Sequence, residues 1–176
     1  MDQNVETTLV RVAEHLQNRF FGKYRGQVED VADPENMGRL LVTVPDVYHD
    51  QTSPWAMPCV PLAGGGYGAF VMPEVGDTVW VEFEAGDISK PIWTGCFWAA
   101  DEGPGGADAA LQVRTLKTPS GHKLAFDDEA GEILLEHSGG ALIKLTSSEI
   151  RLEIGGKSIA ITSTGINMNS GAMEVK

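Results

Sequence analysis

The stretch Ile150-Arg-Leu-Glu-Ile154-Gly-Gly-Lys-Ser-Ile159-Ala-Ile161 decides the fold of the C-terminal third of the chain. Apolar and polar side chains alternate on both sides of a Gly-Gly pair, which is typical of two β-strands joined by a tight turn. The sequence from Ile133 onward can be divided into repeats of about eight residues, each a strand followed by a turn of small residues. This repeat predicts a stack of short strands, a β-prism (β-helix), over residues 118–176.

Such a stack cannot enclose a core by itself. A strand of about five residues covers only about 16 Å and offers one thin apolar face. Other copies of the chain must therefore supply the missing walls, and we expect a trimeric prism. The alternative is an ordinary antiparallel meander packed against its own N-terminal domain, but the small, regular turns favour the prism. The candidate core positions are Leu142, Leu145, Ile150, Leu152, Ile159, Ile161, Ile166 and Met168.

The N-terminal part of the chain has a different pattern. Between Val5 and Phe20 apolar residues recur at helical spacing, which predicts a short helical arm within residues 1–22. Six strand-like segments separated by turn residues then suit a small barrel of the OB type over 23–100; they are Tyr24 to Val31, Gly38 to Val44, Trp55 to Pro61, Gly68 to Met72, Thr78 to Glu84 and Pro91 to Ala99.

Within this barrel Val79, Val81 and Phe83 alternate onto one face, and turns are expected at 73–77 and 84–87. Residues 101–117, which begin with an acidic, glycine-rich run, are interpreted as a linker. The fold class is all-β: an OB-fold barrel with a short N-terminal helix, followed by the trimeric prism.

Charge and composition exclude several classes of protein. The net charge of −12 repels phosphate backbones, and the only basic cluster, Arg19, Lys23 and Arg25, is too small for nucleic acid. No apolar run approaches the length of a membrane span and no export signal is recognised, so synthesis and assembly in the cytoplasm are expected. Cys59 and Cys96 lie in apolar runs and are predicted to be buried free thiols.

No set of residues predicts catalysis. The four histidines lack helical zinc spacing, no nucleophile stands beside a base, and no metal or cofactor is expected. His122, in Ser120-Gly-His-Lys123, is the histidine most suited to a structural contact between copies. The glycine run 63–68 lacks the Gly-Lys-Ser/Thr ending of a phosphate loop. The sequence therefore predicts a protein that is not an enzyme.

Three motifs in the barrel region resemble the baseplate assembly protein V family of phage tails and the related VgrG spikes of type VI secretion systems. They are Gly38-Arg-Leu-Leu-Val-Thr-Val-Pro45, Pro61-Leu-Ala-Gly-Gly-Gly-Tyr-Gly68, and Pro73-Glu-Val-Gly-Asp77 with Val79, Val81, Phe83, Gly86-Asp87 and Pro91-Ile92. Thr118-Pro-Ser-Gly-His-Lys-Leu-Ala-Phe-Asp-Asp128 is similar to the family's transition from barrel to prism.

The resemblance implies a homotrimeric central spike of a contractile injection system or phage-like tail. Its barrels would join the hub or baseplate protein and the inner tube, and its prism would pierce the target envelope, with transient contact with the membrane. A PAAR-type tip protein would cap the prism, with Met173 and Val175 as contact candidates, and effector cargo is a further partner that the resemblance allows. Assembly in the cytoplasm would be followed by incorporation into a virion-like or extracellular injection particle.

Two features of the family are missing from this sequence. No lysozyme-like insertion separates barrel from prism, so cell-wall hydrolysis is not expected. The C-terminus carries no His-x-His motif, so a metal-bound tip is not expected either.

Two other functions compete with the spike. One is an OB-fold binding module for oligosaccharide or single-stranded nucleic acid, which would need exposed stacking aromatics. Trp80, Trp93, Phe97 and Trp98 lie among apolar or acidic neighbours, so we expect them to pack in the core. The other is a hydrolase fused to an OB scaffold, for which no catalytic constellation is present.

Overall fold

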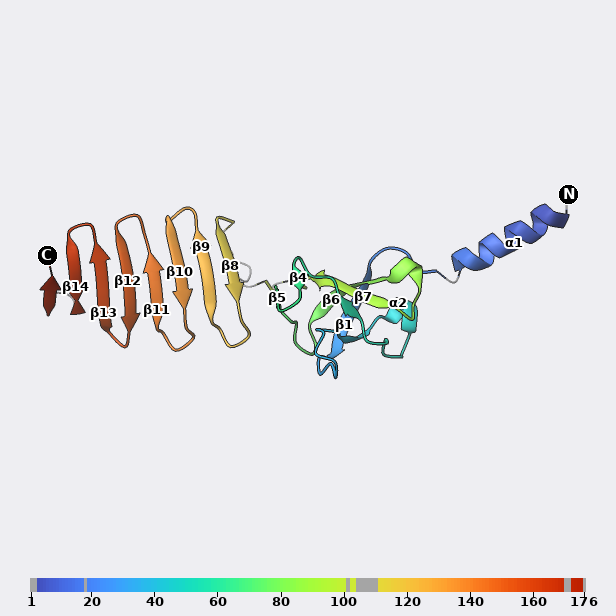
Figure 1. Ribbon diagram of the computed structural model, residues 1–176, viewed down its shortest axis with the longest axis horizontal. Helices are drawn as coiled ribbons and strands as arrows, with labels where there is room; N and C mark the ends of the chain where they lie inside the picture. The colour runs from blue at the N-terminus through green and yellow to red at the C-terminus, as the bar shows by residue number, and fades with distance from the viewer. Residues whose placement is uncertain (1–2, 18, 101, 104–110, 170–171, 176) are drawn as a thin grey trace. The chain divides into compact units, whose positions relative to one another are not determined.

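The computed structural model describes residues 3–17, 19–100, 102–103, 111–169 and 172–175. The chain divides into two compact units, Met1–Ala99 and Ala100–Lys176, which are described separately. Both consist mainly of strands (Figure 1). Among the described residues no helix has the length and apolarity needed to cross a membrane.

The first unit begins with the predicted helix and continues as a barrel. Its main sheet has five strands in the order β2-β1-β6-β7-β3, in which β3 is parallel to β7 and the other pairs are antiparallel. A separate hairpin consists of β4 and β5. The elements are α1 (Gln3–Gln17), β1 (Tyr24–Asp30), β2 (Leu41–Thr43), α2 (Pro45–Tyr48), β3 (Met57–Pro58), β4 (Ala63–Gly64), β5 (Tyr67–Gly68), β6 (Thr78–Phe83), η1 (Glu84–Gly86) and β7 (Pro91–Cys96).

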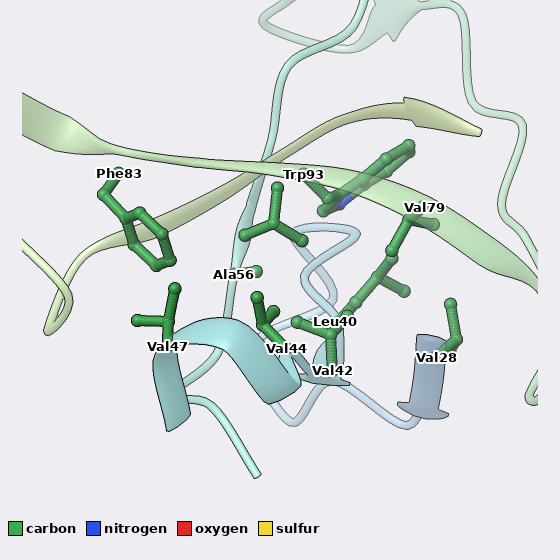
Figure 2. Packing of buried hydrophobic residues seen from close by; sticks show 10 residues of the cluster. Val28, Leu40, Val42, Val44, Val47, Ala56, Val79, Phe83 and Trp93 are labelled. Carbon is green, nitrogen blue, oxygen red and sulfur yellow. The ribbon is translucent and has the colours of Figure 1, made fainter. Parts of the chain in front are cut away.

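The barrel has a core of its own. The alternation predicted for β6 is confirmed, because Val79, Val81 and Phe83 are buried and the residues between them are half-buried. Figure 2 shows Val79 and Phe83 among side chains from β1, β2, α2 and β7. The indole Nε1 of Trp93 donates a 3.0 Å hydrogen bond to the carbonyl of Gly38, which satisfies the one polar atom of this buried ring. The full cluster is Val28, Leu40, Val42, Val44, Val47, Ala56, Val79, Val81, Phe83 and Trp93.

Both predicted turns are present. The amide of Asp77 donates to Glu74 and the Asp77 carboxylate accepts from the Glu74 amide at 2.8 Å, which closes the first turn. In the second, the Asp87 carboxylate accepts from the backbone and hydroxyl of Ser89. The strand expected over Gly68 to Met72 is wrong beyond Gly68: β5 ends there, and residues 69–72 form no ladder.

The predicted burial of the cysteines is also wrong, since Cys59 and Cys96 are both free and exposed. Cys96 is the last residue of β7, beyond a break in the register with β6 that interrupts the alternation of buried Pro91 and Trp93. Apolar neighbours in the sequence therefore do not imply an inward position at this strand end.

The second unit is an eight-stranded antiparallel sheet in which each strand pairs with the next along the chain, drawn as a single layer in Figure 1. Its first strand lies inside residues that the sequence analysis placed in the linker. The strands are β8 (Val113–Lys117), β9 (Lys123–Asp127), β10 (Glu132–Glu136), β11 (Leu142–Leu145), β12 (Glu149–Ile154), β13 (Lys157–Thr162), β14 (Gly165–Met168) and β15 (Met173–Val175).

A buried carboxylate organises the loop between β1 and β2. Asp33 accepts hydrogen bonds from the amides of Glu35, Met37 and Arg39, and from the Arg39 guanidinium at 2.6 and 3.0 Å. The guanidinium also lies over the ring of Trp55, 5.7 Å from its centroid. Because Arg39 and these amides stabilise the charged form, the pKa of Asp33 is well below its usual range.

We predict that Asp33→Asn lowers the midpoint temperature of barrel unfolding at pH 7, because it removes the charge that holds Arg39. Glu35→Gln is the control: Glu35 also contacts Arg39, at 3.2 Å, but is exposed, so the effect should be smaller. Differential scanning calorimetry of both variants measures this.

The same interaction should depend on pH. The lowered pKa means that the stabilisation is complete above the unfolded-state value of about 3.9 and is lost as pH falls through the folded-state value. The difference between wild type and Asp33→Asn should therefore shrink below about pH 4. A difference that stayed constant down to pH 2 would contradict the assignment.

Candidate interface on the C-terminal sheet

The register of the C-terminal sheet separates apolar from polar side chains. Along β12, Ile150 and Leu152 pair with Leu145, Ile143, Ile161 and Ile159. Glu149, Arg151 and Glu153 pair with Thr162, Lys144, Ala160, Ser158 and one leucine, Leu142. Since neighbouring residues of a strand point to opposite faces, the sheet has one apolar and one polar face. The apolar face carries Leu116, Leu124, Phe126, Ile133, Leu135, Ile143, Leu145, Ile150, Leu152, Ile159, Ile161, Ile166 and Met168.

This apolar face is not covered within the unit. Most of its large side chains are exposed, and the rest are half-buried. In the described part of the unit, the hydrophobic residues that are buried are two alanines, Ala125 and Ala160, and both belong to the polar face. A contiguous exposed apolar surface of this kind marks an interaction site.

The polar face is held by ion pairs along and between strands. Lys144 Nζ lies 2.6 Å from Glu132 Oε1, and Arg151 bonds Glu153 at 2.9 Å on one side and lies 3.7 Å from Glu149 on the other. The hydrogen bond to Glu153 raises the pKa of Arg151. These half-exposed pairs contribute modestly to stability, but they suit a surface that faces water.

The turns of the sheet are short and locally specified. Gly155 and Gly156 both have positive φ, 54° and 74°, and form a two-residue turn between Ile154 and Lys157 that fits the twist of a hairpin. Thr146 closes the turn before β12 by accepting from the amides of Ser148 and Glu149.

Two histidines meet at one end of β9 and β10. The rings of His122 and His137 lie 4.4 Å apart, and their Nδ1 atoms accept hydrogen bonds from the amides of Ser138 and Gly139. Among the described residues, no group of three or more His, Cys, Asp or Glu side chains is placed to hold a metal ion. The two hydrogen bonds tie both rings to the turn between β10 and β11.

Seven of the eight predicted core residues lie on the apolar face, and one lies on the polar face. Leu142 lies on the polar face, opposite Glu136 and Glu153, because it stands three positions, an odd number, before Leu145 in the same strand. The tip candidate Met173 pairs with Met168, on the apolar side, and is exposed. Val175 pairs with Ile166, and its side chain lies outside the described part of the chain.

Sequence analysis named no core candidates in the first part of the apolar face, from Leu116 to Ile143. The signal was present, since Leu124-Ala-Phe126 and Ile133-Leu-Leu135 alternate in the same way as the quoted stretch. Residues 118–128 were interpreted as a transition into the prism, and the repeat from Ile133 was used without choosing core positions before Leu142.

An OB barrel with its own core and a strand ladder without one define a class of all-β protein in which the second unit needs partner chains. Comparison with protein families agrees with this. Residues 24–98 match the type VI secretion system/phage-baseplate injector OB domain, and residues 113–174 match the phage baseplate V C-terminal trimerisation domain. The chain belongs to this phage baseplate V and VgrG-like family.

Individual relatives show the same likeness over part of their length. The chain is 32% identical over 130 residues to the type VI secretion system spike protein VgrG3 of Vibrio cholerae, covering 66% of this chain and 13% of that protein. It is 33% identical over 90 residues to the spike protein VgrG4b of Pseudomonas aeruginosa, and 31% identical over 105 residues to the actin cross-linking toxin VgrG1 of Vibrio cholerae. These two matches cover 47% and 54% of this chain, and 11% and 10% of the relatives.

We predict that Leu135→Asp prevents trimer formation, whereas Leu134→Asp does not. The two residues are neighbours in β10 on opposite faces: Leu135 pairs with Ile143, and Leu134 pairs with Lys144, which can accommodate a carboxylate. In a trimer with a shared apolar core, Leu135→Asp would bury three like charges, which is strongly unfavourable.

Native mass spectrometry measures the outcome. The wild type and Leu134→Asp should appear near 56.7 kDa, three times the chain mass of 18.9 kDa, and Leu135→Asp near 18.9 kDa. Equal trimer content in both variants would show that this face is not the shared core.

Proposed function

We propose that the chain is a structural spike protein of a phage-type or type VI-type injection machine. Three copies pack their C-terminal sheets with the apolar faces toward a common axis, so that the ion-paired faces of Lys144 and Arg151 meet water. The observation that carries the proposal is the uncovered apolar face of a unit that matches a trimerisation domain.

The proposed mechanism is mechanical. In a closed prism every strand of the ladder except the first and the last is hydrogen-bonded on both sides, and the apolar axis excludes water, so the body resists bending. The barrels would join the prism to a hub or baseplate protein and the inner tube. Met173 and Val175, at the C-terminal end of the ladder, would contact a PAAR-type tip protein, and the assembled spike would cross the target envelope when the machine contracts.

We infer that this activity involves no catalysis. Two of the three relatives described above are named as spike proteins, and the match to the actin cross-linking toxin covers 10% of that protein. Assembly in the cytoplasm, followed by delivery within an injection particle, accords with the spike role.

Nucleic-acid binding by the barrel is disfavoured because its lysine and arginine side chains contact carboxylates and aromatic rings of the same chain. Lys23 lies 3.1 Å from Glu82, and Arg19 lies 3.9 Å from Asp87. The guanidinium of Arg25 lies over the rings of Trp80 and Phe97, at 5.5 and 5.1 Å from their centroids, so one face of each of these two rings is occupied. Of the four aromatics expected in the core, Trp93 is buried, Trp80 and Phe97 are half-buried, and Trp98 is exposed.

We predict no measurable binding of a fluorescent oligothymidine to the full-length protein at physiological salt. Fluorescence anisotropy measures this, with titration to low salt to detect weak electrostatic attraction, which the net charge of −12 should also suppress. Tight binding that weakens steeply with salt would instead support the OB-fold binding module.

The spike function itself can be tested by complementation. In the organism that encodes the chain, a deletion of the gene should abolish intact injection particles seen by electron microscopy. Leu134→Asp should restore them and Leu135→Asp should not, because only the second disrupts the shared face. Normal particles with Leu135→Asp would overturn the proposal.

A further inference from the structure

An uncharged surface of the barrel follows β3. Residues 60–73 contain no charged side chain, in a chain whose net charge is −12. Three of their large side chains are strongly exposed: Phe70 at 73%, Val71 at 68% and Tyr67 at 66%. Together with Leu62 they border a hollow of about 440 Å³, and we call this surface the hairpin patch.

Contacts within the barrel fix the conformation of the hairpin patch. The ring of Tyr67 lies against Gly64 so closely that an added Cβ there would collide with it, which fixes the β4–β5 hairpin. The amide of Ala69 donates to the carbonyl of Leu62 at 2.9 Å. The Phe70 ring lies over Gly38, where an added Cβ would be 3.2 Å from its edge. Apolar side chains are thus held outward in a defined arrangement.

The topology places this patch at a particular end of the barrel. β3 pairs in parallel with β7, through Met57 with Ile92 and Pro58 with Trp93. Two parallel neighbours point to the same end of a sheet. The hairpin that follows β3 and the chain that leaves β7 toward the trimerisation domain therefore emerge at the same end.

Trimerisation then brings three such ends together. Residues 97–112 join β7 to β8, and even when fully extended they reach no further than about 60 Å. Tethering on this scale converts a weak contact between barrels into an intramolecular one, at an effective concentration on the order of millimolar. Because the chain is acidic, contact between barrels through a surface without charged side chains avoids like-charge repulsion, and the hairpin patch is such a surface.

We propose that the hairpin patches of the three copies pack together, forming a second interface between barrels of the same trimer. This inference rests on the trimer of the proposed function and adds a surface outside the trimerisation domain. The occupant of the patch is the neighbouring copy, with Phe70 and Val71 as the central contacts.

Site-specific cross-linking tests the proposal on the full-length protein. In a Cys59→Ser, Cys96→Ser background, Val71→Cys is treated with a short bismaleimide at low protein concentration and resolved on a denaturing gel. We expect covalent dimers and trimers. The matched control is Ile88→Cys, an exposed position in the reversal between β6 and β7, which lies at the opposite end of β7 and should remain uncross-linked.

A second variant separates contact from mere proximity. Adding Phe70→Asp to the Val71→Cys protein should reduce cross-linking several-fold, because it places like charges in the patch, while the trimer persists through the C-terminal sheet. Phe70 is exposed in the single chain, so the substitution leaves the barrel core intact.

Native mass spectrometry of the same samples distinguishes failure of the barrel interface from failure of the trimer itself. A trimer without cross-links at Val71, or with equal cross-linking at Val71 and Ile88, overturns the barrel interface and leaves the spike proposal standing. A monomer overturns both.

Discussion

The constraint on which this structure depends is that a single antiparallel sheet cannot cover its own apolar face. In the second unit the buried hydrophobic side chains among the described residues are Ala125 and Ala160, while isoleucines and leucines along five strands are exposed. The barrel, in contrast, closes around Leu40, Val81 and Trp93 without help. Association and folding are therefore separate events for the first unit and coupled events for the second, whose stability depends on the concentration of the chain.

Much of this organisation could be predicted from the sequence. Apolar and polar residues alternate along every strand that has one face packed against other residues and the other face in water. This alternation identified β6 and the ladder from β10 to β14. It failed where the decisive information was parity or register. Leu142 was chosen for its apolarity, although it stands three residues from Leu145 and so points the other way. Cys96 follows a register break that the local sequence does not reveal.

The interface proposed between barrels illustrates a different limit. The glycine run at 63–68 could be excluded as a phosphate loop, but the role proposed for it depends on the parallel pairing of β3 with β7, which is a long-range contact. Sequence alone cannot show whether Tyr67 and Phe70 point inward or outward, because both orientations leave the same local pattern. The arrangement of the few cations is equally non-local: Arg25 finds its aromatic partners 55 and 72 residues further along the chain.

The strict chain order of the ladder has a consequence for how such proteins can vary. Each strand of the sheet pairs with its neighbours in sequence, so a whole hairpin can be gained or lost without disturbing pairings elsewhere. Strands lie about 4.8 Å apart, so one hairpin changes the length of the sheet by about 10 Å. Duplication or deletion of a segment of about sixteen residues would therefore lengthen or shorten the sheet by one hairpin, so its length can change in fixed steps.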